Sequence, residues 1–296
     1  GGLNLMYAQF FGSYLLSREA ATPEQMKEAI AKLSNARIKL GTLAMHKGLM
    51  TAEEVDEVCY LQTREDKRFG EIAVERDYLT DAQVSDLLKS QNPDYLLLGQ
   101  NLVDMDVLTN AELEELLLAY QKDSEISDMN VESTEKASQL IRKFLEKSHK
   151  DVSENALMYI NLMFNNLVRF IGEDFTPMTP VACTEYPINY CVTQKVTGPV
   201  SCVSRLDMTE DVALKFASRY AKMDFDQFDE YVRASVEDFL NLHNGLFSVN
   251  MSNEKSIELT LEPPMAEEGD TLTLPAGSYV IPVVYPFGTV HLIVSV

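Results

Sequence analysis

Glycine and threonine recur along the first 122 residues with one shared step of 29 residues. The two series consist of Gly12, Gly41, Gly70 and Gly99, and of Thr22, Thr51, Thr80 and Thr109. Two series that keep the same step indicate a tandem array of one supersecondary unit, because each unit repeats the same turns and contacts. This period restricts the first part of the chain to a stacked repeat fold.

Each threonine opens a capping box, in which a Gln or Glu follows three residues later. The four partners are Gln25, Glu54, Gln83 and Glu112. Apolar residues with helical spacing follow each cap, as at Val55, Val58 and Cys59. We therefore predict an all-α array of four 29-residue helical repeats over residues 1–121, in which the early glycine of each unit lets two helices pack closely.

The two middle units have a specific spacing. The segments KLGTLAMHKGLMTAEEVDEVCYLQ (39–62) and RFGEIAVERDYLTDAQVSDLLKSQ (68–91) are separated by residues 63–67. This arrangement resembles the MshEN-type domain at the N-termini of type II secretion ATPases, in which two 24-residue units separated by five residues bind cyclic di-GMP.

The resemblance to MshEN domains implies a ligand site for cyclic di-GMP at Lys39, Gln62, Arg68 and Gln91. Lys39 stands where the family has an arginine, which binds phosphate and guanine better than lysine does. Asp77 replaces the counterpart of Gly48 and adds negative charge. The alternative is a helical scaffold or docking module that binds no nucleotide.

The composition excludes several classes of function. The chain has 296 residues and a formal net charge of −21, and both halves are acidic, so non-specific binding of nucleic acid is disfavoured. The four cysteines form no CxxC pair and the four histidines are scattered, so we expect no metal site and a cytoplasmic protein. No apolar run approaches the roughly 18 residues that a membrane span requires.

The second half changes from helical repeats to alternating helices and strands. Residues 122–150 are predicted to be a polar linker and a connecting amphipathic helix. Within 151–296, long helices are predicted at 153–172 and 226–247, and strand-like stretches at 181–196, 200–208, 256–264, 277–288 and 289–296. The order predicts an α+β domain with helices on one face of an antiparallel or mixed sheet. The apolar run at the end is typical of a sheet core or of a dimer edge, so a homodimer is an open alternative.

The stretch SVEDFLNLHNG (235–245) places polar residues on one side of the second long helix. At about 100° per residue, Ala234, Asp238, Asn241 and Gly245 share one narrow stripe, opposite an apolar face that includes His243. Small residues on either side of the carboxylate and the amide let another surface approach them. Exposed helix faces more often carry long Lys and Glu side chains.

The stripe resembles the signature of the CheC/CheX/FliY phosphatases, in which a small or acidic residue is followed by a glutamate, an asparagine and a distant proline. Ala234, Asp238, Asn241 and Pro264 occupy these positions, and Gly245 matches a family glycine. The resemblance implies a CheC/CheX-like α/β sandwich with two long helices on a sheet.

The same resemblance implies a reaction. The substrate is the phospho-aspartate of a CheY-like receiver domain, whose own Mg²⁺ supplies most of the charge neutralisation. This chain then needs no cofactor. Asn241 orients the attacking water, and Asp238 pairs with the receiver's lysine.

One substitution weakens the implied activity. Asp238 is shorter than the family's glutamate by one methylene, or about 1.5 Å, and misplacement on this scale costs on the order of 100-fold in rate. Three readings remain open: an active phosphatase, a module that binds a receiver without hydrolysis, and a sensor in which cyclic di-GMP binds the helical repeats.

Overall fold

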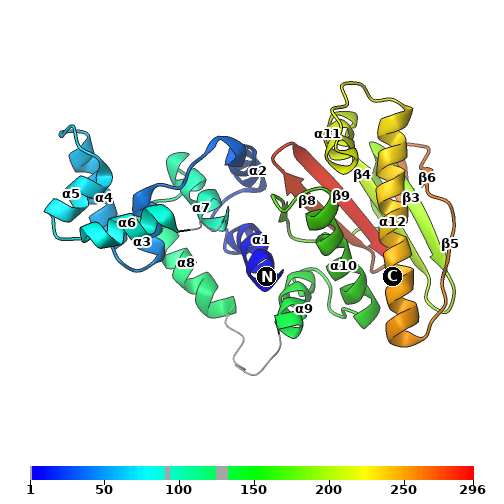
Figure 1. The fold of residues 1–296 in the computed structure, drawn as a ribbon. Coiled ribbons are helices and arrows are strands. Elements are labelled where there is room, and N and C mark those ends of the chain that lie inside the picture. Colours follow the sequence, from blue (N-terminus) through cyan, green and yellow to red (C-terminus); the bar gives the residue numbers. More distant parts are fainter. Residues whose placement is uncertain (1, 91–93, 125–132) are drawn as a thin grey trace. The chain divides into compact units, whose positions relative to one another are not determined.

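The computed structural model describes residues 2–90, 94–124 and 133–296. The chain divides into two compact units (Figure 1). The helical unit comprises residues 7–130, and the mixed unit comprises residues 131–296 together with residues 1–6.

The described part of the helical unit consists of helices and connecting turns. The helices are α1 (Gly2–Ser17), which belongs to this unit from residue 7 onward, α2 (Pro23–Ala31), a 3-10 turn η1 (Leu33–Asn35), α3 (Leu40–His46), α4 (Ala52–Gln62), α5 (Phe69–Glu75), α6 (Asp81–Lys89), α7 (Asp94–Asp104) and α8 (Asn110–Ser124). Their buried residues are mainly apolar, which matches the helical spacing of the sequence.

The predicted capping boxes are confirmed. Thr22, Thr51 and Thr80 each accept a hydrogen bond from the backbone N–H three residues later, and the Gln or Glu at that position accepts one from the threonine N–H. Thr109 and Glu112 make the same reciprocal pair, with distances of 3.1 and 3.2 Å. These bonds satisfy backbone donors that a helix N-terminus leaves unpaired.

A left-handed residue also recurs with the 29-residue step. Glu19, Gly48, Asp77 and Asp106 have φ values of 56°, 70°, 60° and 58°. Each residue lies in the turn between a helix and the next capping threonine. Asp77 therefore keeps the backbone conformation of Gly48, although an L-residue there loses part of the freedom that glycine has.

Three of the repeated glycines lie at close helix contacts. A Cβ placed at Gly41 would lie 2.9 Å from a methyl group of Val55, and one at Gly99 would lie 2.6 Å from a methyl group of Leu113. At Gly70 the corresponding neighbour is Val84, at 3.1 Å. The prediction that these glycines allow close packing is confirmed.

The mixed unit combines helices with antiparallel strands. Its helices are α9 (Ser133–Glu146), α10 (Glu154–Phe170), α11 (Glu210–Ala221) and α12 (Glu230–Lys255). Its strands are β1 (Thr176–Pro177), β2 (Glu185–Pro187), β3 (Tyr190–Thr197), β4 (Cys202–Met208), β5 (Thr260–Leu261), β6 (Met265–Ala266), β7 (Thr271–Thr273), β8 (Tyr279–Tyr285) and β9 (Gly288–Ser295).

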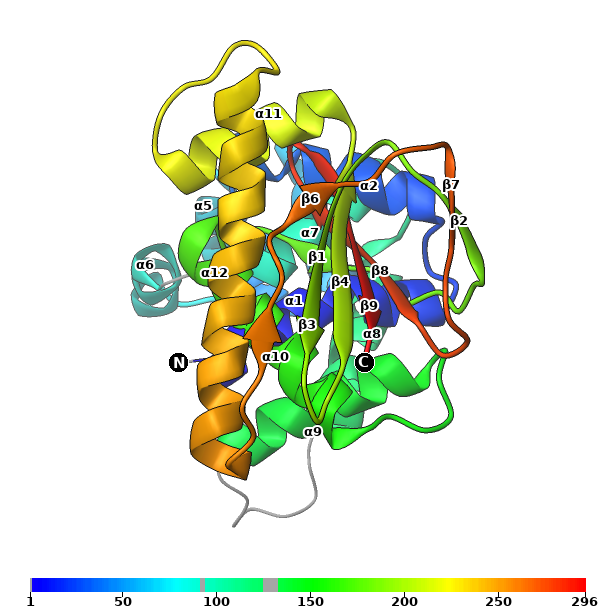
Figure 2. The ribbon, with the colours of Figure 1, turned by 90° about the vertical axis from the view of Figure 1, so that its right-hand side faces the viewer.

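The strands form one main sheet in the order β1-β8-β9-β4-β3-β5, and β6 also pairs with β3. All pairs are antiparallel. Helix α12 runs alongside β3 and the β5–β6 segment (Figure 2). On the same face, Tyr159 of α10 donates a hydrogen bond to Asn244 of α12, which in turn donates one to Ser204 of β4. The expected α+β fold, with two long helices on a sheet, is therefore present.

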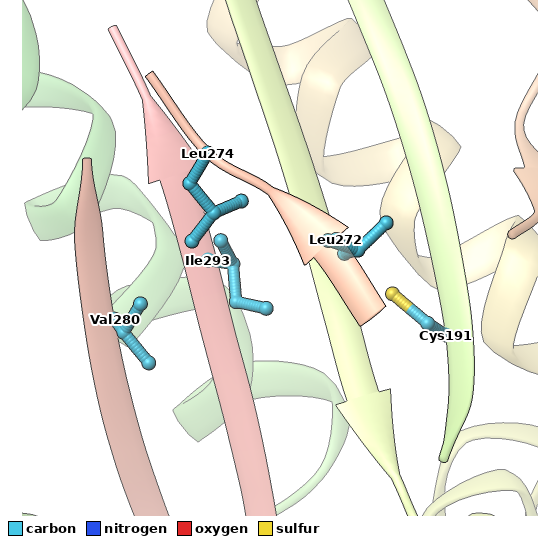
Figure 3. Close-up of a cluster of buried hydrophobic side chains, with 5 residues drawn as sticks. All are labelled: Cys191, Leu272, Leu274, Val280 and Ile293. Atoms are coloured by element: carbon cyan, nitrogen blue, oxygen red, sulfur yellow. The ribbon is translucent and has the colours of Figure 1, made fainter. Parts of the chain in front are cut away.

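The opposite face of the sheet is covered by a short strap. Strands β2 and β7 pair to form this strap, and Leu272 and Leu274 point from it onto the sheet (Figure 3). They pack against Cys191, Val280 and Ile293, all of which are buried. The strap thus covers the part of this face around Cys191, Val280 and Ile293, whereas Lys195 of β3 stays exposed.

Two elements differ from their predicted limits. Helix α12 begins at Glu230 because the Asp229 carboxylate caps it, and it continues to Lys255, eight residues beyond the predicted end at 247. The predicted strand at 256–264 shortens to β5, because Pro263 and Pro264 have no N–H to donate to the sheet. Strand β6 resumes the pairing one residue out of register, which makes Pro264 part of a bulge beside β3.

Candidate functional site

The stripe on α12 faces outward. Ala234, Asp238 and Asn241 are exposed and Gly245 is half-buried. The helix buries its opposite side, which includes Val232, Val236, Phe239, Leu240, His243, Asn244, Phe247 and Met251. The predicted separation of the polar stripe from the packed face is therefore correct, and it leaves the carboxylate and the amide accessible to a second molecule.

The Asn241 side chain is held by the strand beneath it. Gln194 of β3 donates from Nε2 to Asn241 Oδ1 at 2.7 Å. The same Nε2 donates to the backbone carbonyl of Glu262 at 2.9 Å. Asn241 therefore presents its oxygen to the protein and its Nδ2 to the exposed side. An outward amide N–H is the group that can hold a water molecule or an anionic oxygen.

A buried network continues from Gln194 into the core. Asn244 donates from Nδ2 to Gln194 Oε1 at 2.8 Å and to Ser204 Oγ at 3.1 Å. Tyr159 of α10 donates to Asn244 Oδ1 at 2.7 Å. Because every member is buried and bonded, the network is rigid, and the Asn241 amide is tied to three secondary-structure elements.

Asp238 has a partner on the neighbouring helix. Tyr220 of α11 donates its hydroxyl proton to Asp238 Oδ2 at 2.6 Å. Burial, and then the bond to this carboxylate, raise the pKa of Tyr220, so it remains a proton donor throughout the physiological pH range. Asp238 is exposed, and its second oxygen has no hydrogen-bond partner among the described residues, so it can accept from a cation.

The predicted motif proline, Pro264, lies on the segment that Gln194 joins to Asn241. Pro264 follows Glu262, whose carbonyl accepts from Gln194, and it is half-buried in the bulge between β5 and β6. Gln194 thus bridges the Asn241 side chain and the segment that carries Pro264. Ala234 and Gly245 occupy the two flanks of the stripe, as expected.

Exposed apolar side chains lie beyond both flanks. Tyr231 and Val249 are 64% and 53% exposed. At about 100° per residue, both lie on the same side of α12 as Asp238. A cavity of about 510 Å³ also opens beside the first turn of α12, where Tyr190, Phe228 and Arg233 contribute to its wall. The stripe is therefore the centre of a longer surface with apolar ends.

His243 is a core residue, as the helical wheel predicts. Its side chain is fully buried, and Asn166 donates from Nδ2 to its Nδ1 at 2.9 Å. Burial lowers the pKa of His243 to about 3, so the ring is neutral at physiological pH. It lies on the packed side of α12, away from the outward stripe, and it is therefore not placed to act as a base for Asn241.

The predicted nucleotide ligands in the helical unit are engaged locally. Lys39 Nζ lies 2.8 Å from the carboxylate of Asp104, and Gln62 donates from Nε2 to the Lys67 carbonyl at 3.5 Å. Arg68 precedes α5, with its backbone N–H bonded to Glu71. No hydrogen bond or ion pair joins Lys39, Gln62 and Arg68 to one another in the part of the chain that the structure describes.

The fourth predicted ligand, Gln91, lies outside the described residues. Cyclic di-GMP binding by this unit therefore stays a prediction. Asp104 is an acidic group that a phosphate would have to displace from Lys39.

Within residues 2–90, 94–124 and 133–296, no group of three or more His, Cys, Asp or Glu side chains is arranged to hold a metal ion. None of the described helices combines the length and the apolar character needed to cross a membrane.

Sequence reasoning missed the residues that support the site. Gln194, Asn244 and Tyr220 all bond to a stripe residue directly or through one neighbour. A signal existed for Gln194, because it stands between Val192 and Val196 at an inward position of a strand, where a polar side chain needs a partner. No comparable signal linked Tyr220 to Asp238.

No family model matches the sequence, and no curated protein matches it. Solved structures of CheX- and CheC-like chemotaxis proteins resemble about half of the chain. The CheX of Desulfovibrio desulfuricans is 17% identical, with a TM-score of 0.40, over 48% of this chain and 99% of that protein. The CheX of Vibrio vulnificus is 13% identical, with a TM-score of 0.41, over 48% and 98%.

A complex of CheX with CheY, BeF₃ and Mg²⁺ from Borrelia burgdorferi also resembles the chain. It is 17% identical, with a TM-score of 0.39, over 47% of this chain and 94% of that one.

Proposed function

We propose that the mixed unit removes the phosphoryl group from a phosphorylated aspartate on a CheY-like receiver domain. The observation that carries this proposal is the outward Nδ2 of Asn241, whose Oδ1 is held by Gln194 at 2.7 Å, one turn from the accessible carboxylate of Asp238. The resemblance of Ala234, Asp238, Asn241 and Pro264 to the CheC/CheX/FliY signature supports the same assignment.

The reaction is a hydrolysis. A water oxygen forms a bond to phosphorus while the bond from phosphorus to the aspartyl oxygen breaks. The electron pair of that bond leaves on the receiver's carboxylate, and the water proton passes to phosphate or solvent. Asn241 accelerates this step by holding the water in line with the leaving oxygen, because phosphoryl transfer depends mainly on positioning and charge stabilisation. The divalent cation that offsets the phosphoryl charge belongs to the receiver.

Asp238 acts at the interface with the receiver. Its free carboxylate oxygen pairs with a cationic side chain that the receiver carries beside its phospho-aspartate. Tyr220 holds the other oxygen and therefore limits the carboxylate to one orientation. This restraint lowers the entropy that Asp238 loses when the receiver docks.

The shape of α12 suits docking of a globular partner. Ala234 and Gly245 add almost no side-chain bulk, so a receiver surface can reach the carboxylate and the amide. Tyr231 and Val249 are separated by 18 residues, or about 27 Å of helix, and both are exposed. Apolar contacts at these two ends would supply binding energy while the centre carries the chemistry.

The competing proposal is a receiver-binding module without activity, and the shorter reach of Asp238 motivates it. A phosphorylated receiver with Mg²⁺ is incubated with the wild-type chain or with Asn241→Ala, and phosphate release and receiver binding are both followed. We expect the wild type to speed phosphate release and Asn241→Ala to lose this effect while still binding. Binding without any acceleration by the wild type would establish the module and exclude the enzyme.

A further inference from the structure

Gln194, beneath the candidate site, uses all of its side-chain hydrogen-bonding groups within the protein. It lies in the middle of β3 and is only 1% exposed. Its Nε2 donates to Asn241 Oδ1 and to the Glu262 carbonyl, and its Oε1 accepts from Asn244 Nδ2. An amide has two N–H donors and one carbonyl acceptor, so both donors and the acceptor are used.

The bonds of Gln194 determine which way the Asn241 amide faces. A backbone carbonyl can only accept, so the Gln194 atom beside Glu262 must be the nitrogen. The same nitrogen faces Asn241, which must then offer its oxygen. Asn241 therefore points Nδ2 outward. A flipped Asn241 would place two N–H donors against each other.

The orientation is anchored from the other end as well. Asn244 Nδ2 donates to Gln194 Oε1, and Tyr159 donates to Asn244 Oδ1, so neither of these amides can turn without breaking buried bonds. A lost bond in this network leaves a buried donor or acceptor unpaired. The Glu262 carbonyl, which can only accept, thus fixes the sense of a chain of amides that ends at the exposed Asn241, and the bond of the Tyr159 hydroxyl to Asn244 adds to the cost of turning it.

We infer that Gln194 is a positioning residue that fixes the Asn241 amide with its N–H donors toward the substrate. The inference rests on the proposed phosphatase function for its kinetic consequence, whereas the fixed amide orientation stands without that function. Gln194 does not touch substrate, and it acts only through Asn241.

Two variants separate the effect of the donor from the effect of side-chain size. In Gln194→Glu the side chain has nearly the same shape, and its ionised carboxylate can only accept; at a pH above the pKa of this carboxyl, which burial raises, the Asn241 amide turns Nδ2 inward and exposes its oxygen. In Gln194→Met the side chain keeps its length and bonds to neither partner, so the Asn241 amide rotates freely. The matched control is Thr193→Val, because Thr193 is buried on the same strand but bonds to Glu267 on the opposite face.

The first readout is kinetic. We expect Gln194→Glu to lower kcat on the order of 100-fold, the scale of a misdirected catalytic group, with little change in KM. Gln194→Met should lose less, because part of its population keeps the productive orientation. Thr193→Val should retain kcat. Urea unfolding of the three variants shows whether a loss of kcat merely follows a loss of stability.

The second readout is the solvent exchange of side-chain amide protons, measured by NMR on the full chain. In the wild type the Gln194 amide protons should be protected and those of Asn241 should exchange rapidly. In Gln194→Glu the Asn241 protons should become protected, and in Gln194→Met they should remain unprotected. If Gln194→Glu fails to fold, the comparison of Gln194→Met with Thr193→Val still decides whether Gln194 orients the Asn241 amide.

The two readouts separate this inference from the proposed function. A wild type without phosphatase activity but with the expected exchange pattern would overturn the proposed function. The conclusion that Gln194 fixes the orientation of the Asn241 amide would still stand. An active wild type whose Gln194→Met variant retains full kcat, or whose Gln194 protons exchange rapidly, would overturn the role of Gln194.

Discussion

The hydroxyl of Tyr220 on α11 donates a hydrogen bond of 2.6 Å to Asp238 Oδ2 on the exposed face of α12. This contact ties the short carboxylate to one orientation and leaves its second oxygen exposed. Asp238 has one methylene fewer than the glutamate of the CheC/CheX/FliY signature that the stripe resembles. The bond from Tyr220 fixes the position of this shorter side chain.

Tyr220→Phe tests the value of that restraint. The ring remains and only the donor is lost, so Asp238 gains rotational freedom. We expect KM for the phosphorylated receiver to rise roughly two- to tenfold, the range that a hydrogen bond worth about 0.5–1.5 kcal/mol implies, while kcat changes little. Steady-state kinetics measure both constants, and an unchanged KM would show that Tyr220 does not assist docking.

Gly245→Ala separates stability from docking. A Cβ at Gly245 would meet no atom within 4 Å, and Gly245 lies inside α12, so alanine should stabilise the chain. The expected gain in the free energy of unfolding is about 0.5–1 kcal/mol. The added methyl projects from the docking stripe and should weaken receiver binding. Urea unfolding and a binding titration measure the two effects, and a more stable variant with undiminished binding would remove Gly245 from the interface.

His243 predicts how stability depends on pH. Its pKa falls from an ordinary value of about 6.5 to about 3 through burial. Below about pH 6.5 the unfolded chain binds a proton at this residue that the folded chain does not, so stability falls as pH falls. The limiting contribution is about 1.4 kcal/mol for each pH unit.

His243→Gln isolates this contribution, because glutamine can still accept the bond from Asn166. Urea unfolding of both chains at pH 6.5 and pH 5.5 gives the comparison. We expect the wild type to lose about 1 kcal/mol more than the variant over this step. Equal losses would mean that the ring takes up its proton in the folded state.

Cyclic di-GMP binding by the helical unit is tested by calorimetric titration. Arg68→Ala should lower the affinity, because it removes a cation from the predicted ligand set. Asp104→Asn should raise the affinity, because it releases Lys39 from its ion pair. The absence of heat at high protein concentration would leave the unit as a scaffold or docking module.

Local sequence rules predicted the features that depend on neighbours along the chain. The capping boxes, the close-packed glycines and the outward stripe of α12 each follow from a spacing within one or two helices. The start of α12 was predicted less well, because the apolar pattern does not show that Asp229 caps the helix.

The support of the site depends on which strand lies beneath α12. Gln194 and Asn241 are separated by 47 residues, and they meet because α12 packs on β3. Tyr220 reaches Asp238 because α11 packs on α12. A helical wheel shows the direction of a side chain, but it does not show which residue of another element meets it.

The most direct measurement is the decay of a phosphorylated receiver, present in excess with Mg²⁺, after addition of a substoichiometric amount of this chain. The proposed function predicts that each molecule clears many phosphoryl groups and that Asn241→Ala returns the decay to the receiver's own rate. A decay that the wild type does not accelerate, or that Asn241→Ala accelerates equally, would contradict the assignment of Asn241 as the catalytic residue.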